Sequence, residues 1–284
     1  MIECRLMNFL STIINQKRRR VETAKLSVSP EVLEVMARKA RESAVPHALA
    51  AALGDESRIN IIAEFKRKSP SRGVIRDNAD PESITKGYEA AGAAAISVLT
   101  EEDYFDGSLD DLRAVRQATL LPILRKDFVF EEYQVYESAA AGADALLLIV
   151  AALDDETLSR PRRLAEDELG MDALVEVHTR EEMERAVNSG AKLIGVNNRN
   201  LDTFEVSLET SAQLAPTKVN DALLVSESGI ESADDIRRLY DLGYRGFLIG
   251  EGLMRADDPG KTLREFTQRR QGAKEDGSSS EFKL

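Results

Sequence analysis

The sequence predicts an α/β protein, a closed (β/α)8 barrel of parallel strands with an N-terminal helical extension. Short apolar runs recur along the chain, and several of them end in a charged or amide side chain. A buried charge without a partner is costly, so these strand ends are expected to converge on one polar site. A barrel of parallel strands brings them together, because its active site forms where the strands end.

A second pattern, a weak internal repeat, leads to the same fold. Four glycines each stand between a helix-like stretch and an apolar run. The intervals from Gly92 to Gly142, Gly190 and Gly243 are 50, 48 and 53 residues. A left-handed residue commonly ends a helix, and glycine adopts that conformation at least cost. About fifty residues hold two strand–helix units, so four glycines, each marking one such pair of units, predict eight strands.

The predicted strands are short and almost continuously apolar, as parallel strands covered on both faces are. In chain order they are residues 60–65, 95–99, 123–126, 146–149, 173–177, 193–196, 223–226 and 247–249. A doubly wound open sheet is the rival arrangement. Eight strands within residues 46–270 suit the closed barrel better.

Residues 1–45 show helical rather than strand-like periodicity. The first apolar stripe consists of Leu10, Ile13, Ile14, Val21 and Ala24. A second helix is expected to begin at Ser29 and Pro30, a serine cap followed by proline at the first helical position. Its stripe consists of Val32, Leu33, Met36 and Ala40. We expect both helices to pack on the barrel, with the basic run 17–20 facing solvent. Residues 271–284 are rich in Ser, Gly and charge and are expected to be a disordered tail.

Composition and charge exclude several classes of partner. The 284-residue chain is 43% apolar, and its net charge of −12 repels nucleic acid and anionic lipid. No apolar run is long enough to span a bilayer, and the N-terminus has no signal-peptide pattern. Cys4 is the only cysteine, so no internal disulfide is possible. We expect a cytoplasmic protein, a monomer or weak homodimer, that binds neither nucleic acid nor membrane.

The first predicted strand ends in the densest group of chemically active side chains. Side chains alternate along a strand, so Glu64 and Lys66 point to the same face and Phe65 points toward the helices. The Glu–Lys pair suits acid–base chemistry, because each group changes the proton affinity of the other. A structural ion pair at the barrel mouth is the alternative. The basic run 66–68 offers local cations for an anionic substrate.

The third strand ends at Lys126, a second candidate for proton transfer. A lysine in a partly dry pocket loses proton affinity and can become a general acid near neutral pH. A simple ion pair with the adjacent Asp127 is the alternative.

Two further strand ends carry polar side chains. Glu176 is the charged residue of an otherwise apolar strand, and the neighbouring His178 is interpreted as part of the following loop. Asn197 and Arg199 follow the sixth strand, where amide and guanidinium groups suit a carboxylate or a hydroxylated chain. A turn is the alternative for these two, because Asn favours turns.

Loops after the last two strands indicate a phosphate site. Ser228 and Gly229 follow one strand, and Gly250 and Glu251 follow the next. Small residues let backbone N–H groups approach an anion, and barrels often bind phosphate between these two loops. If only the backbone of Glu251 contacts the phosphate, its acidic side chain can point away. The hydroxyls of residues 69–73 either bind the phosphate or cap a turn.

These segments together resemble the indole-3-glycerol phosphate synthases, the ring-closing enzymes of tryptophan biosynthesis. The resemblance extends from the N-terminal helices to about Phe266. It is carried by the segments IAEFKRKSPS at 62–71, LRKDF at 124–128, LVEVH at 174–178, GVNNRNL at 195–201, VSESGI at 225–230 and GEGLMR at 250–255. Other phosphate-binding TIM barrels share the last two loops but not the Glu-x-Lys and Lys-Asp-Phe segments.

The resemblance implies one reaction. Its substrate is 1-(2-carboxyphenylamino)-1-deoxyribulose 5-phosphate, and its products are indole-3-glycerol phosphate, carbon dioxide and water. The electron-rich aniline ring attacks the ketone, the carboxylate leaves, and hydroxide is lost to restore aromaticity. An acid must protonate the ketone oxygen and later the leaving hydroxyl, and a base must remove the ring-nitrogen proton.

The resemblance also implies a role for each candidate residue. Lys126 matches the main general acid, Glu176 the carboxylate that partners it, and Lys66 a second lysine that holds the substrate and assists. Glu64 and Asn197 match residues that position the lysines and the substrate hydroxyls. The polar wall, the phosphate-binding positions and the aromatics near the aniline ring are matched by Arg199, Glu227, Ser69, Ser228, Gly229, Gly250, Glu251, Phe105 and Phe128.

No cofactor or metal is implied, because two histidines and one cysteine form no ligand cluster. One departure from the family pattern is Gly252, where a serine is expected. Two alternatives remain. Another phosphate-sugar barrel enzyme, such as phosphoribosylanthranilate isomerase, would require a different acid–base pair. A non-catalytic barrel would lack at least one of Lys66, Lys126 and Glu176, and all three are present.

Overall fold

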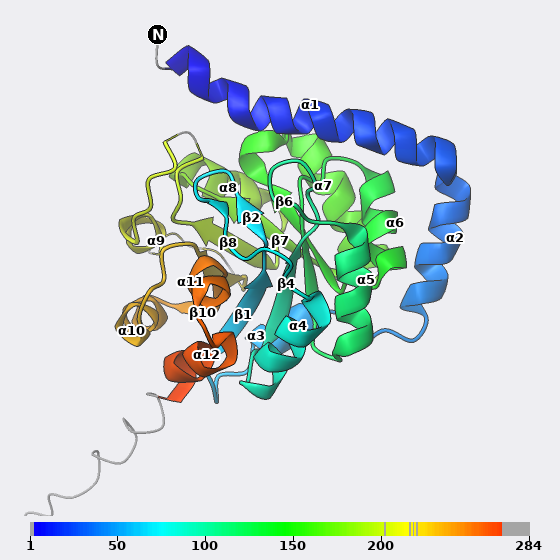
Figure 1. The fold of residues 1–284 in the computed structure, drawn as a ribbon. Helices are drawn as coiled ribbons and strands as arrows, with labels where there is room; N and C mark the ends of the chain where they lie inside the picture. The colour runs from blue at the N-terminus through cyan, green and yellow to red at the C-terminus, as the bar shows by residue number, and fades with distance from the viewer. Residues whose placement is uncertain (1–2, 202, 216, 218, 220, 269–284) are drawn as a thin grey trace, which may run out of the picture.

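Eight parallel strands close into a barrel in the computed structural model, which describes residues 3–268 except positions 202, 216, 218 and 220 (Figure 1). Around the barrel the order is β1-β10-β9-β8-β7-β6-β5-β4. The strands are β1 (Asn60–Phe65), β4 (Ala95–Leu99), β5 (Ile123–Lys126), β6 (Ala145–Ile149), β7 (Asp172–Val177), β8 (Leu193–Asn197), β9 (Leu223–Glu227) and β10 (Tyr244–Ile249). The predicted closed barrel is confirmed, and the doubly wound sheet is excluded.

The strands differ from the predicted ones only at their ends. The strands β8 and β9 each extend by one residue, to Asn197 and Glu227, and these two residues are register partners. The polar residues that follow these two apolar runs are therefore part of the ladder. The strand β10 begins at Tyr244, before an irregularity in its pairing with β9 between Tyr244 and Gly246.

The repeated glycines end helices, as predicted. Gly92, Gly142, Gly190 and Gly243 have φ angles of 91°, 95°, 85° and 102°. Gly142 and Gly190 cap α6 (Glu132–Ala141) and α8 (Arg180–Ser189). A side chain strains this left-handed backbone, so glycine is the residue that returns the chain to the next strand.

Helices cover the outside of the barrel, and several begin at a side chain that accepts a backbone N–H, as good N-caps do. These caps are Asp80, Ser108, Asp154, Thr179 and Ser232. The remaining helices are α3 (Ala48–Leu53), α4 (Pro81–Ala90), α5 (Leu109–Ala118), α7 (Asp155–Arg163), α9 (Glu209–Leu214), α10 (Ala233–Asp241), α11 (Glu251–Arg255) and α12 (Pro259–Gln268). The short strands β2 (Lys68–Ser69) and β3 (Gly73–Val74) form a hairpin after β1.

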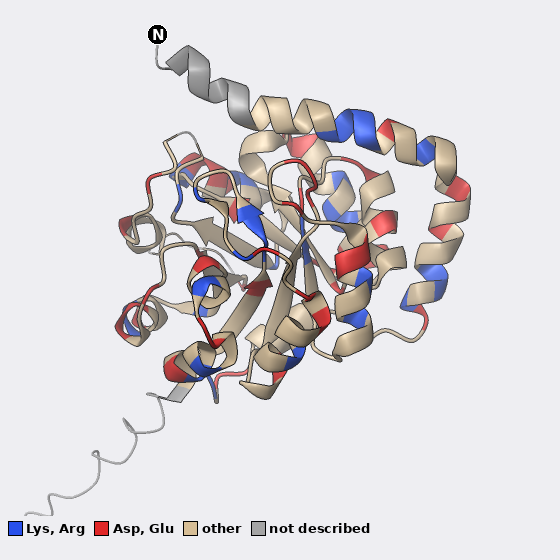
Figure 2. Cartoon of the chain, in the orientation of Figure 1, with Lys and Arg blue, Asp and Glu red and all other residues tan. Residues whose placement is uncertain are grey.

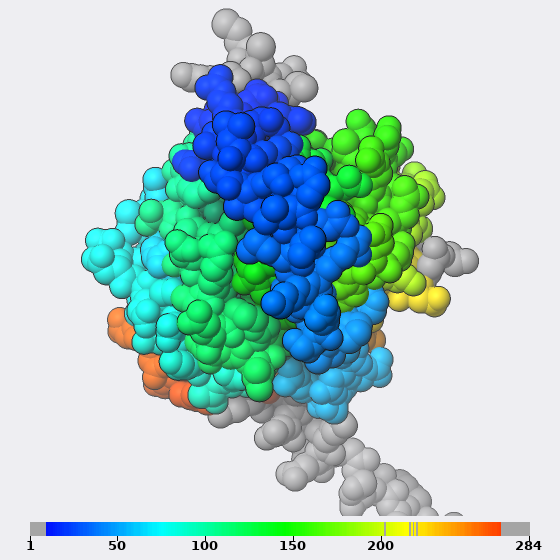
Figure 3. Space-filling view, turned by 90° about the vertical axis from the view of Figure 1, so that its right-hand side faces the viewer, coloured from blue at the N-terminus to red at the C-terminus, as the bar shows by residue number. Residues whose placement is uncertain are grey.

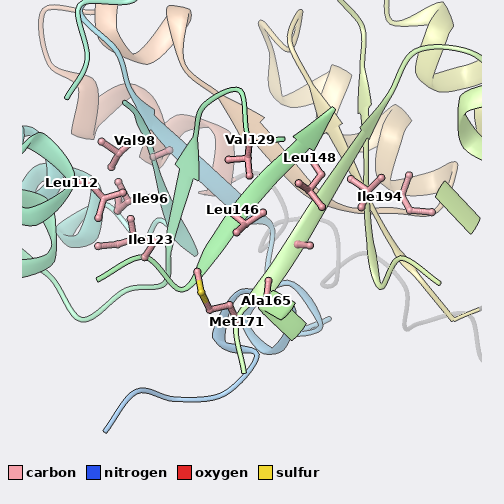
Figure 4. Packing of buried hydrophobic residues seen from close by; sticks show 14 of the residues in the cluster. Ile96, Val98, Leu112, Ile123, Val129, Leu146, Leu148, Ala165, Met171 and Ile194 are labelled. Atoms are coloured by element: carbon pink, nitrogen blue, oxygen red, sulfur yellow. The ribbon is translucent and has the colours of Figure 1, made fainter. Parts of the chain in front are cut away.

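Alternating side chains divide the core into two layers. The outer layer lies between strands and helices and includes Phe65, Leu146 and Leu148 (Figure 4). The inner layer fills the barrel, where residues such as Ile62 and Leu124 belong to one cluster with Leu49 and Leu53, the buried side chains of α3. Two residues beyond Ile62 and Leu124 the chain reaches the barrel mouth, where the same alternation directs Glu64 and Lys126 into the site.

The N-terminal helices α1 (Glu3–Ser27) and α2 (Pro30–Arg41) run across the mouth of the barrel and down its side (Figures 1 and 3). Ser29 caps α2 and Pro30 starts it, as predicted. The predicted stripe of α2 is partly wrong, because Leu33 and Ala37 are buried whereas Val32 and Met36 are exposed. None of the described helices is long and apolar enough to cross a membrane. The predicted tail at 271–284 lies outside the described residues.

The basic turn of α1, visible in Figure 2, was expected to face solvent, and this expectation is wrong for Lys17. Its side chain is 4% exposed, and its Nζ lies 2.9 Å from Asp127 Oδ1 and 2.7 Å from Glu102 Oε2. Arg20 bonds to Asp103 at 2.6 Å. The loops after β4 and β5 present these carboxylates, so the helix is attached to the mouth by charge as well as by apolar packing.

Candidate active site

A cavity of about 480 Å³ opens at the C-terminal ends of the strands. All the predicted site residues line it: Glu64, Lys66, Ser69, Phe105, Lys126, Phe128, Glu176, Asn197, Arg199, Glu227, Ser228, Gly229, Gly250 and Glu251. They come from seven segments far apart in the sequence. Their catalytic and binding roles remain predictions, but the structure places them around one space.

Lys126 lies at the centre of the acidic part of this cavity. Its Nζ is 2.6 Å from Glu227 Oε2 and 3.2 Å from Glu176 Oε2. Burial by itself would lower the pKa of Lys126, but the charges of Glu227, Glu176 and Glu64 outweigh burial and raise its pKa. The expected loss of proton affinity by Lys126 is therefore wrong. Lys126 carries its proton at neutral pH.

The carboxylate of Glu227 differs from that of Glu176. Burial raises the pKa of Glu227 to about 7, and the nearby charge of Glu176 acts in the same direction. Glu176 is also buried, but Lys126, His178 and Asn197 together hold its pKa below the usual value. One carboxylate beside Lys126 can therefore hold a proton near neutral pH, while the other stays ionised.

Lys66 and Glu64 form a second pair at the end of β1, with 2.6 Å between Lys66 Nζ and Glu64 Oε1. Both side chains point into the cavity, as alternation along the strand predicts. The other members of the basic run turn elsewhere. Arg67 bonds to Asp111 at 2.6 Å and lies over the ring of Phe65. The run therefore contributes Lys66 to the site and not a cluster of three cations.

Asp127 is not the partner of Lys126. Its carboxylate is fully buried and contacts Lys17, Arg125 and the hydroxyl of Thr100. Burial would raise the pKa of Asp127, but the Lys17 and Arg125 cations outweigh burial and hold that pKa well below the usual range. The alternative interpretation of Lys126, an ion pair with its neighbour in sequence, is wrong because the two side chains point to opposite faces of the strand.

Two adjacent asparagines at the end of β8 point to opposite sides of the barrel wall. Asn197 lines the cavity, and its Oδ1 accepts the backbone N–H of Arg199 at 3.0 Å. Asn198 faces outward and is buried, and its amide bonds to Ser226 Oγ and to the carbonyl oxygens of Glu227 and Ser228. Asn198 therefore ties the ends of β8 and β9 together and helps to set the position of Glu227.

Three arginines gather where a phosphate was predicted. The carboxylate of Glu251 lies 3.1 Å from Arg72, 3.6 Å from Arg199 and 3.5 Å from Arg255. The side chain of Glu251 therefore faces the arginines that line the cavity. Sequence reasoning missed Arg72 and Arg255 in particular, since neither ends a strand.

The backbone and hydroxyls at this end of the cavity also suit an anion. Ser69 is buried, with its Oγ 3.5 Å from Ser71 Oγ. Ser228 and Gly229 both have positive φ angles, 65° and 78°, so the chain turns sharply here. A side chain on Gly229 would come within 2.5 Å of Val206. By contrast, a Cβ on Gly252 would meet nothing, so the departure from serine requires no rearrangement.

An apolar wall faces the polar groups. The rings of Phe105 and Phe128 are 6.5 Å apart and tilted by 42°. Leu10 and Ile13 of α1 complete this side of the cavity. Flat aromatic faces and aliphatic side chains suit an aniline ring, and the N-terminal extension supplies part of the surface.

His178 belongs to the loop after β7, as predicted, but sequence reasoning did not place its ring next to Glu176. Its backbone lies in the bend between β7 and α8. The distance from His178 Nε2 to Glu176 Oε1 is 3.4 Å. The spacing of two residues from Glu176 was the available signal, because strand alternation places both on one face.

Within the described residues, no group of three or more His, Cys, Asp or Glu side chains is placed to hold a metal ion. The site's groups are acids, bases and hydrogen-bond donors. Such a set suits proton transfer at a substrate with a carboxylate and a phosphate.

Residues 10–266 match the family model described as indole-3-glycerol phosphate synthase. The chain belongs to that family. A relative of that name from Carboxydothermus hydrogenoformans is 48% identical over 259 residues, 90% of this chain and 98% of the relative. Another, from Syntrophobacter fumaroxidans, is 47% identical over 260 residues, 91% of this chain and 97% of the relative. Membership makes the chain a carboxy-lyase of tryptophan biosynthesis, which confirms the predicted family and activity.

Solved structures with low identity share the barrel. Thiamine phosphate pyrophosphorylase from Pyrococcus furiosus is 20% identical with a TM-score of 0.55, covering 76% of this chain and 96% of that chain. KGPDC from Streptococcus mutans, in complex with D-R5P, is 14% identical with a TM-score of 0.56, covering 73% and 94%. At such identity these likenesses show the fold alone.

Proposed function

We propose that Lys126 is the general acid of the synthase reaction and that Glu176 and Glu227 control its proton. The observation that carries this proposal is the position of the Lys126 ammonium, held between two carboxylates and facing a cavity lined by aromatic rings. As the aniline ring attacks the ketone, Lys126 donates a proton to the ketone oxygen. In the later loss of water, Lys126, reprotonated from solvent, protonates the leaving hydroxyl, and Glu176, which stays ionised, accepts the ring-nitrogen proton.

Lys66 serves as the second cation. Paired with Glu64 at 2.6 Å, it lies at the end of β1, within the same cavity as Lys126. We assign it the substrate carboxylate, which it holds until carbon dioxide leaves. Two ammonium groups on different strands can then bind two oxygens of one substrate. Two fixed contacts orient the substrate better than a single mobile cation would.

The phosphate is assigned to the end of the cavity where Arg72, Arg199 and Arg255 surround Glu251. Ser69 and the backbone at Gly229 and Gly250 line the same end. In this assignment a phosphate takes over the arginine contacts that Glu251 holds without substrate. Guanidinium groups bind phosphate oxygens through paired N–H donors, which fixes the orientation of the sugar chain.

The test is a metal-free assay of the purified protein with the carboxyphenylamino-deoxyribulose phosphate, followed by indole fluorescence. The chain has no tryptophan, so background emission is low. Lys126→Ala is expected to lower kcat by roughly 10²-fold or more with little change in KM. Lys68→Ala, which changes a lysine outside the cavity lining, is the matched control. Full turnover by the Lys126 variant contradicts the assignment.

We also propose that the protein is cytoplasmic and acts as a monomer or weak homodimer, without nucleic-acid partners. The net charge of −12 and the single cysteine support this proposal. Light scattering over a range of protein concentrations tests the oligomeric state, and a stable dimer at nanomolar concentration contradicts it. Fractionation of cells tests the compartment, and recovery from the membrane or secreted fraction contradicts it.

A further inference from the structure

His178 lies between two carboxylates that belong to different elements. Its Nδ1 is 3.2 Å from Glu182 Oε2 on α8, and its Nε2 is 3.4 Å from Glu176 Oε1 on β7. Glu182 is held in place, because the same oxygen accepts the backbone N–H of His178 at 2.7 Å. Thr179 caps the helix and accepts the backbone N–H of Glu182. The ring is therefore fixed from the helix side and faces the active site on the other side.

This arrangement decides which form of the ring fits. A neutral imidazole has one N–H donor and one lone pair. With either tautomer, one ring nitrogen would direct a lone pair at a carboxylate. Nε2 is buried and has no hydrogen-bond partner of good geometry among the described residues. Solvent therefore does not reach Nε2 to separate a lone pair there from the Glu176 carboxylate. Only the imidazolium presents an N–H to both Glu176 and Glu182.

The charged groups around the ring favour the same form. Burial would lower the pKa of His178, but the hydrogen bond to Glu182 and the charges of Glu176, Glu182 and Glu227 outweigh burial and raise it. Lys126 lies on the far side of Glu176, bonded to the other carboxylate oxygen at 3.2 Å. Glu176 is thus held between an ammonium and an imidazolium.

We propose that His178 is a positioning residue, an imidazolium that bridges Glu182 and Glu176 and so holds Glu176 ionised and turned toward Lys126. The proposal rests on the assignment of Lys126 and Glu176 to the chemistry. His178 is not among the residues that line the cavity, and neither is Glu182, so both act on the reaction through Glu176. Loss of the imidazolium would free one carboxylate oxygen and lower the fraction of Glu176 that is correctly placed.

The protonation state is measured independently of activity by ¹⁵N NMR of the histidine side chains. The chain has two histidines, so a His47→Gln variant assigns the signals of His178. We expect both ring nitrogens of His178 to carry protons at pH values above the ordinary histidine value of 6.5. Glu182→Gln should lower the midpoint of this titration. A neutral His178 with a midpoint at or below 6.5 overturns the proposal.

Kinetics test the consequence for catalysis. Glu182→Gln is expected to match the wild type near pH 6, where the ring is protonated in both, and to lose about tenfold in kcat toward pH 8.5. KM should change little. The matched control is Glu181→Gln, which removes a fully exposed charge from the same turn of α8 without touching the ring. A loss that is equal at every pH indicates a merely structural role and overturns the proposal.

A double-mutant cycle separates this proposal from the assignment on which it rests. His178→Gln should lower kcat about tenfold, and Glu182→Gln should add nothing in that background. Additive losses overturn the bridge. If Lys126→Ala and Glu176→Gln abolish turnover while His178→Gln leaves kcat unchanged, the positioning role fails and the proposed function stands. If those two variants remain active, the proposed function fails, while the NMR titration still reports the state of the ring.

Discussion

Two glycines at inward positions of the barrel make room for two of the carboxylates. A Cβ on Gly195 would overlap Glu227 Oε1, and a Cβ on Gly250 would overlap Glu64 Oε1. The ladder pairs Gly195 with Val225 on β9, two residues before Glu227. At the scale of single residues, the acid–base groups therefore depend on neighbours that have no side chain.

Gly250→Ala tests this dependence. The new methyl group pushes Glu64 away from Lys66, so we expect kcat to fall by roughly 10²-fold, as misplacement by about 1 Å does in active sites. The control is Gly252→Ala, because a Cβ there meets nothing. Steady-state kinetics and thermal unfolding of both variants make the comparison. Wild-type kcat in the Gly250 variant contradicts the packing argument.

At the scale of elements, the attachment of α1 depends on charge buried under the helix. Lys17 is the residue of the basic turn that reaches Asp127, and Asp127 directly follows Lys126 in the chain. Arg125 also bonds to Asp127, at 2.9 Å, so helix and strand share one carboxylate. The packing of α1 and the conformation at the end of β5 are therefore coupled.

Lys17→Ala is expected to lower the free energy of unfolding by about 3 kcal/mol, because it leaves a buried carboxylate short of a cation. Arg20→Ala, which removes a half-exposed pair with Asp103 on the same helix, should cost less than about 1 kcal/mol. Urea unfolding at pH 7 measures both. Equal losses in the free energy of unfolding for the two variants would show that Lys17 stabilises the fold no more than a surface residue does.

At the scale of the whole molecule, one closed barrel and the helix α1 across its mouth bring the site together. The polar ends of five strands face one cavity, and α1 adds Leu10 and Ile13 to it. The division of the chain at residue 45 stays a prediction. It has a physical basis in the contrast between the helical periodicity before that residue and the strand–helix alternation after it.

The stability of the whole fold in acid should depend strongly on the protonation of Asp127. Its pKa is lowered in the folded state, so it contributes stability above the unfolded value near 4 and loses it as pH falls below that value. The free energy of unfolding of the wild type should fall by up to about 1.4 kcal/mol per pH unit more steeply than that of Asp127→Asn in this range. Urea titrations between about pH 4 and pH 2 measure the slopes. Parallel slopes would contradict the assignment.

Much of the site was predictable because strand alternation is local. Glu64, Lys126 and Glu176 could be placed on the inner face from their spacing to apolar neighbours alone. Arg72 could not, because its place depends on how the β2–β3 hairpin folds back toward Glu251, which is distant in sequence. Arg255 lies one helical turn after Glu251 on α11, so the spacing of four residues was the available signal for that pair.

The sequence by itself determined the closed barrel, its eight strands, the glycine turns and the residues that face the mouth, because hydrophobic period and turn chemistry are properties of short segments. Only the tertiary structure decided which charges meet. Lys126 pairs with Glu176 and Glu227 rather than Asp127, Lys17 is buried, and His178 lies between two carboxylates. Proton affinities depend on distances across the barrel, and those distances exist only once the strands have closed.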